Sequence, residues 1–141
     1  MADALKGQVA IITGAAHGMG EAIARTYSRE GAAVGLLDRD GEALAHVVND
    51  IQALGGKAMG QTVDVRDYPA LERAVAAIES TLGPTDILVN SAGLGIYKMF
   101  TELTEDDWDT TFDVNVKGTF LMCKAVVPGM IERGKGLVIN I

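Results

Sequence analysis

The sequence lacks the features that disulfide-bonded, membrane and nucleic-acid-binding proteins need. Its one cysteine, Cys123, excludes a disulfide within the chain. No apolar run approaches the length of a membrane span, and the chain does not open on a basic segment followed by an apolar core. Basic residues are scarce, with 12 Lys and Arg against 19 Asp and Glu, a net charge of −7. We therefore expect a soluble, cytoplasmic protein that binds neither nucleic acid nor membranes.

What the sequence does contain is a regular alternation of short apolar runs with helical patterns. The alternation predicts βαβ units, and therefore a doubly wound parallel sheet with helices on both faces, of the α/β class. Helices are expected over Met19–Glu30 and Gly41–Leu54, and over a third segment that Asp67 caps and Gly83-Pro84 ends. The strand-like runs are Val9–Thr13, Ala33–Leu37, Lys57–Val65, Asp86–Val89 and Gly136–Ile141.

The last helix and the last strand carry two further expectations. Thr104 with Asp107 three residues later indicates a capping box that opens a long helix. The run Leu137–Ile141 is typical of a fully buried strand in the middle of a parallel sheet, and chains rarely end on such a strand. We therefore expect Ile141 to be the cut edge of a longer protein. The inner face of the long helix is expected to carry Trp108, Phe112, Val116, Phe120, Cys123 and Val127.

A glycine-rich turn, TGAAHGMGEA, follows the first strand and opens the first helix. Such a turn lets backbone N–H groups approach a pyrophosphate at the positive end of a helix. We expect Gly14 to allow the tight turn, Gly18 the close approach of a ligand, and Gly20 the packing of helix against strand. The alternative is a turn that needs glycine for backbone reasons alone.

An acidic residue ends the second strand. Asp38 follows Gly18 by 20 residues, where a dinucleotide-binding fold places a carboxylate on the adenosine ribose. The same carboxylate would repel a 2′-phosphate. The alternative is a helix N-cap or a solvated loop acid. Arg39 leaves a second possibility open, because it can serve a 2′-phosphate if Asp38 turns away.

Together these segments resemble the short-chain dehydrogenase/reductase family, in its single-domain branch. The resemblance rests on Thr13-Gly14-x-x-x-Gly18-x-Gly20, on LVNSAG at 88–93, on DVNVKGTF at 113–120, and on Asp64 in VDV. It covers all 141 residues in order, although Ser91 replaces the second Asn of the family's N-N-A-G segment. It implies a Rossmann-type sheet of strand order 3-2-1-4-5, and hydride transfer between a nicotinamide and a small-molecule alcohol or carbonyl.

The resemblance also implies which residues form the site. Asp64 matches the acid that contacts the adenine amino group, and Asn115 matches the catalytic Asn whose local backbone holds a proton-relaying water. NAD(H) is expected in preference to NADP(H), and the parent is expected to be a homo-oligomer, a dimer or tetramer, with the long helix in an interface. The cofactor-binding residues are expected to be Gly14, Ala16, His17, Gly18, Met19, Gly20, Asp38, Arg39, Asp64, Val65, Asn90, Ala92 and Gly93.

Other polar residues favour plainer roles. Asn90, at a strand end, can form a turn or tie neighbouring strands together. His17 is interpreted as a solvated loop histidine as well as a phosphate neighbour, His46 as a surface residue, and Cys123 as a small core residue. Two histidines and one cysteine far apart in sequence give no metal-ligand spacing, so no metal site is expected.

The family's proton-transfer residues are missing. The family uses a Ser after the fifth strand and a Tyr-x-x-x-Lys on the next helix, but the fourth residues after Tyr27, Tyr68 and Tyr97 are Gly, Glu and Thr. We therefore expect residues 1–141 to be the NAD-binding portion of an oxidoreductase, truncated after the fifth strand and inactive alone. The alternative is a stand-alone nucleotide-binding or interaction module without catalysis.

Overall fold

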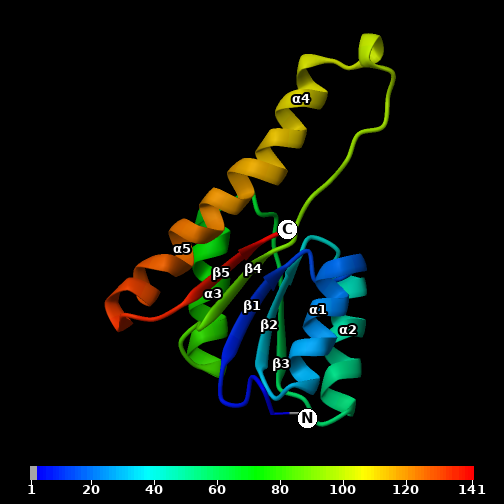
Figure 1. Cartoon of the computed structure of the whole chain (residues 1–141). Coiled ribbons are helices and arrows are strands. Elements are labelled where there is room, and N and C mark those ends of the chain that lie inside the picture. Colours follow the sequence, from blue (N-terminus) through cyan, green and yellow to red (C-terminus); the bar gives the residue numbers. More distant parts are fainter. Residues whose placement is uncertain (1–2) are drawn as a thin grey trace.

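The structure, a computed structural model, describes residues 3–141 and contains one five-stranded parallel sheet (Figure 1). The strand order is β3-β2-β1-β4-β5, which confirms the Rossmann-type, doubly wound α/β architecture. Neighbouring strands are in regular register, with Ile11 opposite both Gly35 of β2 and Leu88 of β4. The strands are β1 (Val9–Thr13), β2 (Ala33–Asp38), β3 (Ala58–Thr62), β4 (Ile87–Asn90) and β5 (Leu137–Asn140).

Helices cover both faces of the sheet and divide the core into two layers. α1 (Gly18–Arg29) and α2 (Gly41–Ala53) pack on one face, and α3 (Tyr68–Leu82) and α5 (Gly118–Arg133) on the other (Figure 1). Successive residues of a strand point to opposite faces, so in β1 Ile12 joins the first layer and Ile11 the second. Both are fully buried, which explains why β1 is a continuous apolar run.

The helix boundaries follow the expected signals. The Asp67 side chain accepts a hydrogen bond from the Ala70 N–H (3.1 Å), with Pro69 in the first turn of α3. Thr104 and Asp107 form a complete capping box at α4 (Glu105–Phe112). β3 is shorter than expected, because it ends at Thr62, but the next apolar side chain, Val63, is still buried.

An arm extends beyond the carboxyl ends of the strands (Figure 1). It consists of the loop after β4, a 3₁₀ turn η1 (Phe100–Glu102) and α4. A π-helical turn η2 (Asp113–Lys117) joins α4 to α5, so that the helix runs without a break from 105 to 133. By length and composition this helix could cross a membrane, a criterion that core helices of soluble domains also meet, and it packs against α3.

The prediction of which side chains form the inner face of the long helix is wrong. Trp108, Phe112, Val116 and Phe120 are 43–64% exposed, and we call these residues the outer apolar row. The covered face of α5 instead holds Leu121, Met122, Val126 and Met130. α5 is apolar on two faces, and periodicity cannot tell which of them the sheet and α3 will cover. Cys123 and Val127 are partly buried beside the core, as expected for Cys123.

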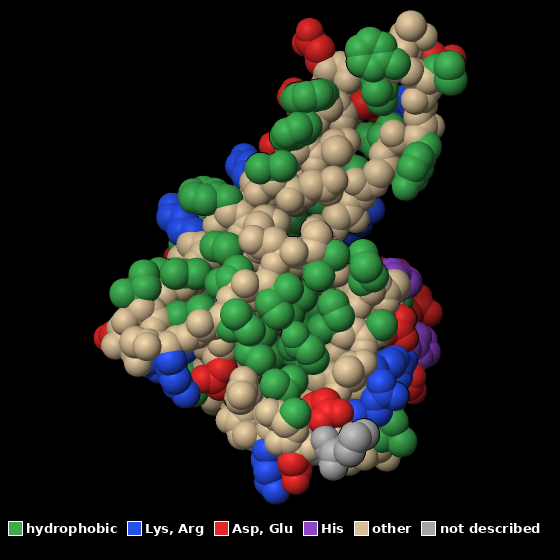
Figure 2. Space-filling view, in the orientation of Figure 1, with side chains coloured by type: hydrophobic (Ala, Val, Ile, Leu, Met, Phe, Trp, Pro, Cys, Tyr) green, Lys and Arg blue, Asp and Glu red, His purple; other side chains and the backbone are tan. Residues whose placement is uncertain are grey.

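The last strand is not a fully buried central strand within this chain. β5 is the edge strand, and its Leu137 and the following Ile141 are 53% and 62% exposed. On the side where α1 and α2 lie, Ile87 and Val89 of β4 are buried, whereas Ile139 of β5 is only partly buried. Figure 2 shows hydrophobic side chains gathered on this face, left of α1 and α2. A continuous apolar run therefore indicated two apolar faces, without showing that both are covered.

Candidate functional site

The glycine loop packs tightly on one side and is open on the other. Gly14 has φ +65°, and a Cβ atom on it would lie 2.9 Å from backbone atoms of Ser91 and Ala92. A Cβ atom on Gly20 would collide with the carbonyl of Gly14, so Gly20 lets α1 pack against the turn. Gly18 has φ +56° and no neighbour within 4 Å of its Cβ position. The loop thus presents an open backbone at the N-terminus of α1, where an anion is favoured.

Thr13 joins this loop to the segment after β4. Its hydroxyl oxygen accepts hydrogen bonds from the N–H groups of Ser91 (3.1 Å) and Ala92 (3.0 Å), and the residue is 1% exposed. The glycine loop and the segment after β4 are therefore held together by one buried side chain. Thr13 is not among the expected site residues, although a Thr that ends an apolar strand just before the glycine loop is a usable signal in the sequence.

Asp38 lies between the glycine loop and the start of α2. Its Oδ2 accepts a hydrogen bond from the Ala16 N–H (3.0 Å), and its Oδ1 accepts one from the Asp40 N–H (2.9 Å). Each oxygen keeps a further acceptor position. The alternative role as N-cap belongs to Asp40, whose side chain accepts from the Ala43 N–H. Asp38 is thus oriented by backbone groups and remains able to accept from a ligand.

His17 is solvent-exposed, and its Nε2 lies 3.0 Å from Oδ2 of Asp40. The hydrogen bond from the Ala43 N–H and the contact with His17 lower the pKa of the Asp40 carboxyl. The pair connects the glycine loop to α2 across the surface. His46 is exposed on α2, as expected. Within residues 3–141, no group of three or more His, Cys, Asp and Glu side chains is arranged to hold a metal ion.

Asp64 follows β3 and is paired with a neighbouring guanidinium. Arg66 donates from Nη2 to Oδ2 of Asp64 (2.6 Å), and this interaction is the main reason that the pKa of Asp64 is lowered. No signal in the sequence marks Arg66, because a charged residue in a turn belongs to no periodic pattern. Asp64 and Val65 lie at the same end of the sheet as Asp38.

One cavity brings many of the expected cofactor residues together at the carboxyl ends of β1, β2, β3 and β4. Open parallel sheets bind ligands at this edge. Ala16, His17, Gly18, Met19, Gly20, Asn90 and Asn115 are not among its lining residues. Apolar side chains outside the expected cofactor-binding set also line it, namely Leu37, Val63, Leu94 and Val114. The expected residues in its lining are Gly14, Asp38, Arg39, Asp64, Val65, Ala92 and Gly93.

Two asparagines outside the cavity lining hold neighbouring segments in place. The Asn90 amide donates to Oδ1 of Asn140 (2.9 Å) and so ties β4 to β5. A tie between neighbouring strands is one of the two roles expected for Asn90. The side chain of Asn115, in η2, accepts from the Leu94 N–H (2.8 Å) and donates to the Leu94 carbonyl (2.9 Å). Its own carbonyl accepts from the Thr119 hydroxyl (3.2 Å). Asn115 thus fixes the loop that borders the cavity.

Comparison with known proteins gives consistent matches over nearly the whole chain. The family model described as short chain dehydrogenase matches residues 8–141. The chain is 39% identical over 140 residues to 2,3-dihydro-2,3-dihydroxybenzoate dehydrogenase of Bacillus subtilis, covering 99% of this chain and 54% of that protein. It is 40% identical over 136 residues to D-threitol dehydrogenase of Mycolicibacterium smegmatis, covering 96% of this chain and 52% of that protein.

Solved structures show the same similarity. A 7α-hydroxysteroid dehydrogenase complexed with NADH and 7-oxo glycochenodeoxycholic acid superposes with a TM-score of 0.91 at 38% identity, over 97% of this chain and 53% of that one. A metagenomic short-chain oxidoreductase in complex with NADP gives a TM-score of 0.89 at 37% identity, over 96% of this chain and 62% of that one. The chain spans about half the length of the curated relatives that it matches.

Proposed function

This chain belongs to the short-chain dehydrogenase family, and from that premise we propose that it forms the cofactor-binding part of an NAD(H)-dependent oxidoreductase that interconverts an alcohol and a carbonyl. The observation that carries the proposal is the cavity shared by Gly14, Asp38 and Asp64 at one edge of the parallel sheet. Its relatives are oxidoreductases, and solved relatives hold NADH or NADP, which supports a nicotinamide cofactor.

The residues present fit a dinucleotide, because they offer an open glycine loop beside two carboxylates. Backbone N–H groups near Gly18, at the start of α1, would hold the pyrophosphate. Asp38 would accept hydrogen bonds from the ribose hydroxyls, and Asp64 one from the adenine amino group. Gly93 and the loop after it would border the nicotinamide, which supplies hydride-transfer chemistry when bound.

The proposed preference for NAD(H) rests on charge around Asp38. Its carboxylate would lie against a 2′-phosphate, and like charges at that distance disfavour NADP(H). The loop segment 15–17 has no Lys or Arg to offset this repulsion. Arg39 is exposed and close enough to Asp64 to lower the pKa of that carboxyl, so its charge is already partly balanced.

The proton-transfer residues of the reaction are not in this chain. Tyr97 is 97% exposed on the arm, and neither it nor the other tyrosines begins a Tyr-x-x-x-Lys. We propose that the Ser, Tyr and Lys come from a part of the parent protein outside these 141 residues, with the backbone at Asn115 holding a water in the proton relay. The absence of Tyr-x-x-x-Lys equally favours the second candidate function, a dinucleotide-binding module without catalysis.

Calorimetric titration of the 141-residue chain with NADH and NADPH tests the proposal. We expect NADH to bind more tightly, and no NADH-linked turnover, because a positioned general acid contributes about 10²–10⁴-fold. Failure to bind either dinucleotide would overturn both candidate functions. Turnover that survives repurification would overturn the assignment of proton transfer to residues outside the chain.

A further inference from the structure

Arg66 holds the carboxylate of Asp64 from several directions. Its Nε lies 3.0 Å from Oδ1 and 3.1 Å from Oδ2, and its Nη2 lies 2.6 Å from Oδ2. The backbone N–H of Arg66 also donates to Oδ1 (2.9 Å). Two-pronged contact between a guanidinium and a carboxylate fixes the plane of the carboxylate as well as its charge.

The backbone of this turn does not depend on the guanidinium. The N–H of Asp67 donates to the carbonyl of Asp64 (3.0 Å), and Asp67 then caps α3. The backbone bond from Arg66 to Oδ1 closes the turn through the Asp64 side chain. Replacing the Arg66 side chain therefore removes the fork and leaves these backbone contacts in place.

Counting donors shows that Asp64 has room for one ligand group. Three N–H groups of Arg66 donate to the carboxylate, with the Nε hydrogen shared between the two oxygens, and a carboxylate accepts about four hydrogen bonds, so one further N–H group can be accepted. The hydrogen bonds among residues 3–141 leave the N–H of Val65 without an acceptor. An acceptor and a donor on adjacent residues that line one cavity match the edge of adenine, whose amino group neighbours an accepting ring nitrogen. Hypoxanthine presents the reverse arrangement.

We infer that Arg66 is a positioning residue for base recognition, holding Asp64 so that its free acceptor position meets the amino group of the cofactor's base. The inference rests on the proposed function, since it requires that a dinucleotide occupies the cavity that Asp64 lines. The contact with Arg66 also keeps Asp64 ionised, because it lowers the pKa of the carboxyl. Arg66 itself acts only through Asp64.

The test measures the dissociation constants of NADH and reduced nicotinamide hypoxanthine dinucleotide for the 141-residue chain. We expect wild type to favour NADH by about tenfold or more, since a site that pairs with an N–H group rejects an analogue lacking it. Arg66→Gln should weaken NADH binding by about three- to tenfold and change binding of the analogue little. Arg66→Lys keeps the charge without the fork and should fall in between. Arg73→Gln, an exposed arginine on α3, is the matched control and should match wild type.

Each remaining outcome overturns the inference. Tighter NADH binding by Arg66→Gln would mean that Arg66 masks Asp64, and equal weakening of both dinucleotides would mean a general electrostatic role. If Arg66→Gln fails to fold by circular dichroism, Arg66→Lys decides the matter, and a wild-type ratio in that variant counts against positioning. A wild-type chain that binds neither dinucleotide removes the proposed function as well, whereas normal NADH binding with an unchanged ratio removes only this inference.

Discussion

At the scale of the residue, Asp38 shows how one carboxylate can be fixed and still available. The N–H groups of Ala16 and Asp40 each occupy one of its oxygens, which sets the side chain against the cavity. These bonds also link the glycine loop to the turn after β2. A ligand hydroxyl that bonds to Asp38 therefore meets an acceptor whose orientation is already fixed before the ligand binds.

Asp38→Ala should weaken NADH binding and reduce the difference between the dissociation constants of NADH and NADPH. Losing a charge-assisted acceptor costs about 1.5–3 kcal/mol, which is about tenfold or more in the dissociation constant. Loss of the carboxylate also removes the repulsion of a 2′-phosphate and leaves Arg39 free to meet it. Calorimetric titration with both cofactors measures the effect. Glu42→Ala, which removes an exposed acid from the first turn of α2, is the charge-matched control.

Two results would contradict this assignment. One is tighter binding of NADPH than of NADH by the wild type. The other is an equal weakening of NADH and NADPH binding in Asp38→Ala. That result would mean that Asp38 acts by holding the glycine loop and not by contacting the ribose. Urea unfolding of the variant separates a loss of fold from a loss of contact.

At the scale of the element, Asp86 joins the starts of the neighbouring strands. Its Oδ2 accepts from the Val9 N–H (3.0 Å) at β1, and its Oδ1 pairs with Nζ of Lys135 (3.0 Å) just before β5. Burial raises the pKa of Asp86, but the Val9 N–H and Lys135 lower it by more, so the net pKa lies below its ordinary value. The ionised form is thus favoured in the folded state.

Asp86→Asn should therefore lower the free energy of unfolding at neutral pH, and should lower it by less in acid. A carboxyl whose pKa is lower in the folded than in the unfolded chain stabilises the fold above its unfolded pKa of about 3.9, and this contribution is lost as pH falls through the folded pKa. We expect the variant to lose about 1–2 kcal/mol of unfolding free energy at pH 7, and the difference from wild type to shrink below about pH 4. Urea unfolding at pH 7 and pH 3 measures it.

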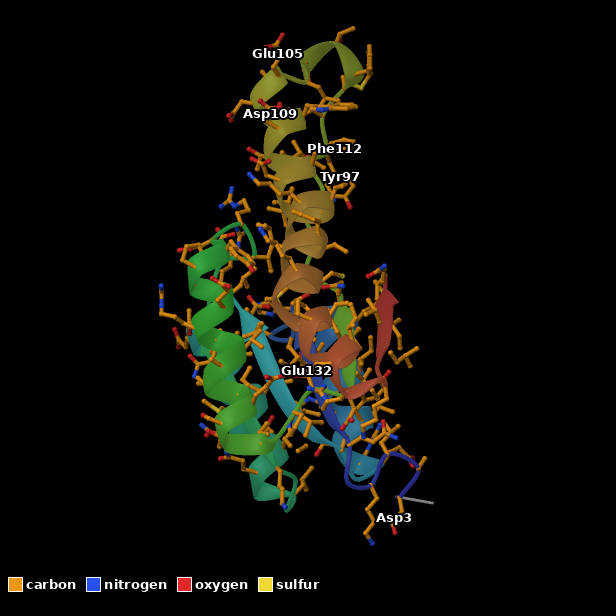
Figure 3. All side chains as sticks on the ribbon, turned by 90° about the vertical axis from the view of Figure 1, so that its left-hand side faces the viewer. Asp3, Tyr97, Glu105, Asp109, Phe112 and Glu132 are labelled. Carbon is orange, nitrogen blue, oxygen red and sulfur yellow. The ribbon has the colours of Figure 1, made fainter. Side chains whose placement is uncertain are left out.

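The matched control for this prediction is Glu132→Gln, since Glu132 is an exposed acid on α5 (Figure 3). Its unfolding free energy should follow that of the wild type at both pH values. A constant difference between Asp86→Asn and wild type across this pH range would show that the amide loses packing or a hydrogen bond, and not the benefit of the charge.

Local sequence signals predicted the helices and strands well, but they could not predict contacts between residues far apart in the chain. Thr104 with Asp107, and Gly20 against Gly14, act within a turn or two, so their effects could be predicted from the sequence. The covered face of α5 depends on what else is in the fold, which periodicity does not record. Thr13 contacts Ser91 and Ala92 across nearly eighty positions, and no local pattern encodes such a pairing.

At the scale of the whole molecule, two apolar surfaces are exposed among the residues that the structure describes. One is the outer apolar row of the long helix, in which Trp108 and Phe112 stack with ring centroids 4.4 Å apart. In Figure 3, Phe112 and Tyr97 lie at a similar height on the arm, on its helix and loop sides. The other is the exposed face and edge of β5. Uncovered apolar rows and unpaired edges favour association with another chain.

We therefore expect the chain to self-associate through the outer apolar row. Sedimentation velocity at tens of micromolar should show a dimer or larger species, and the double variant Phe112→Glu, Phe120→Glu should shift it toward monomer because it would bury charge in the contact. Ile131→Glu is the control, since Ile131 is 74% exposed on α5 but lies outside the row. A wild type that stays monomeric contradicts the prediction, and undiminished association of the double variant points to the β5 edge instead.

The π-helical turn at Asp113–Lys117 has a geometric consequence for the same row. Residues four apart on an α-helix advance by 400°, so each step winds about 40° further around the axis and a run of four side chains spirals by about 120°. A π turn closes its hydrogen bonds over five residues and winds less per residue, so the step from Phe112 to Val116 turns the other way and cancels part of that drift. The outer apolar row therefore spirals less around the long helix than it would on an unbroken α-helix, so a partner has less far to wind around that helix to meet all four side chains.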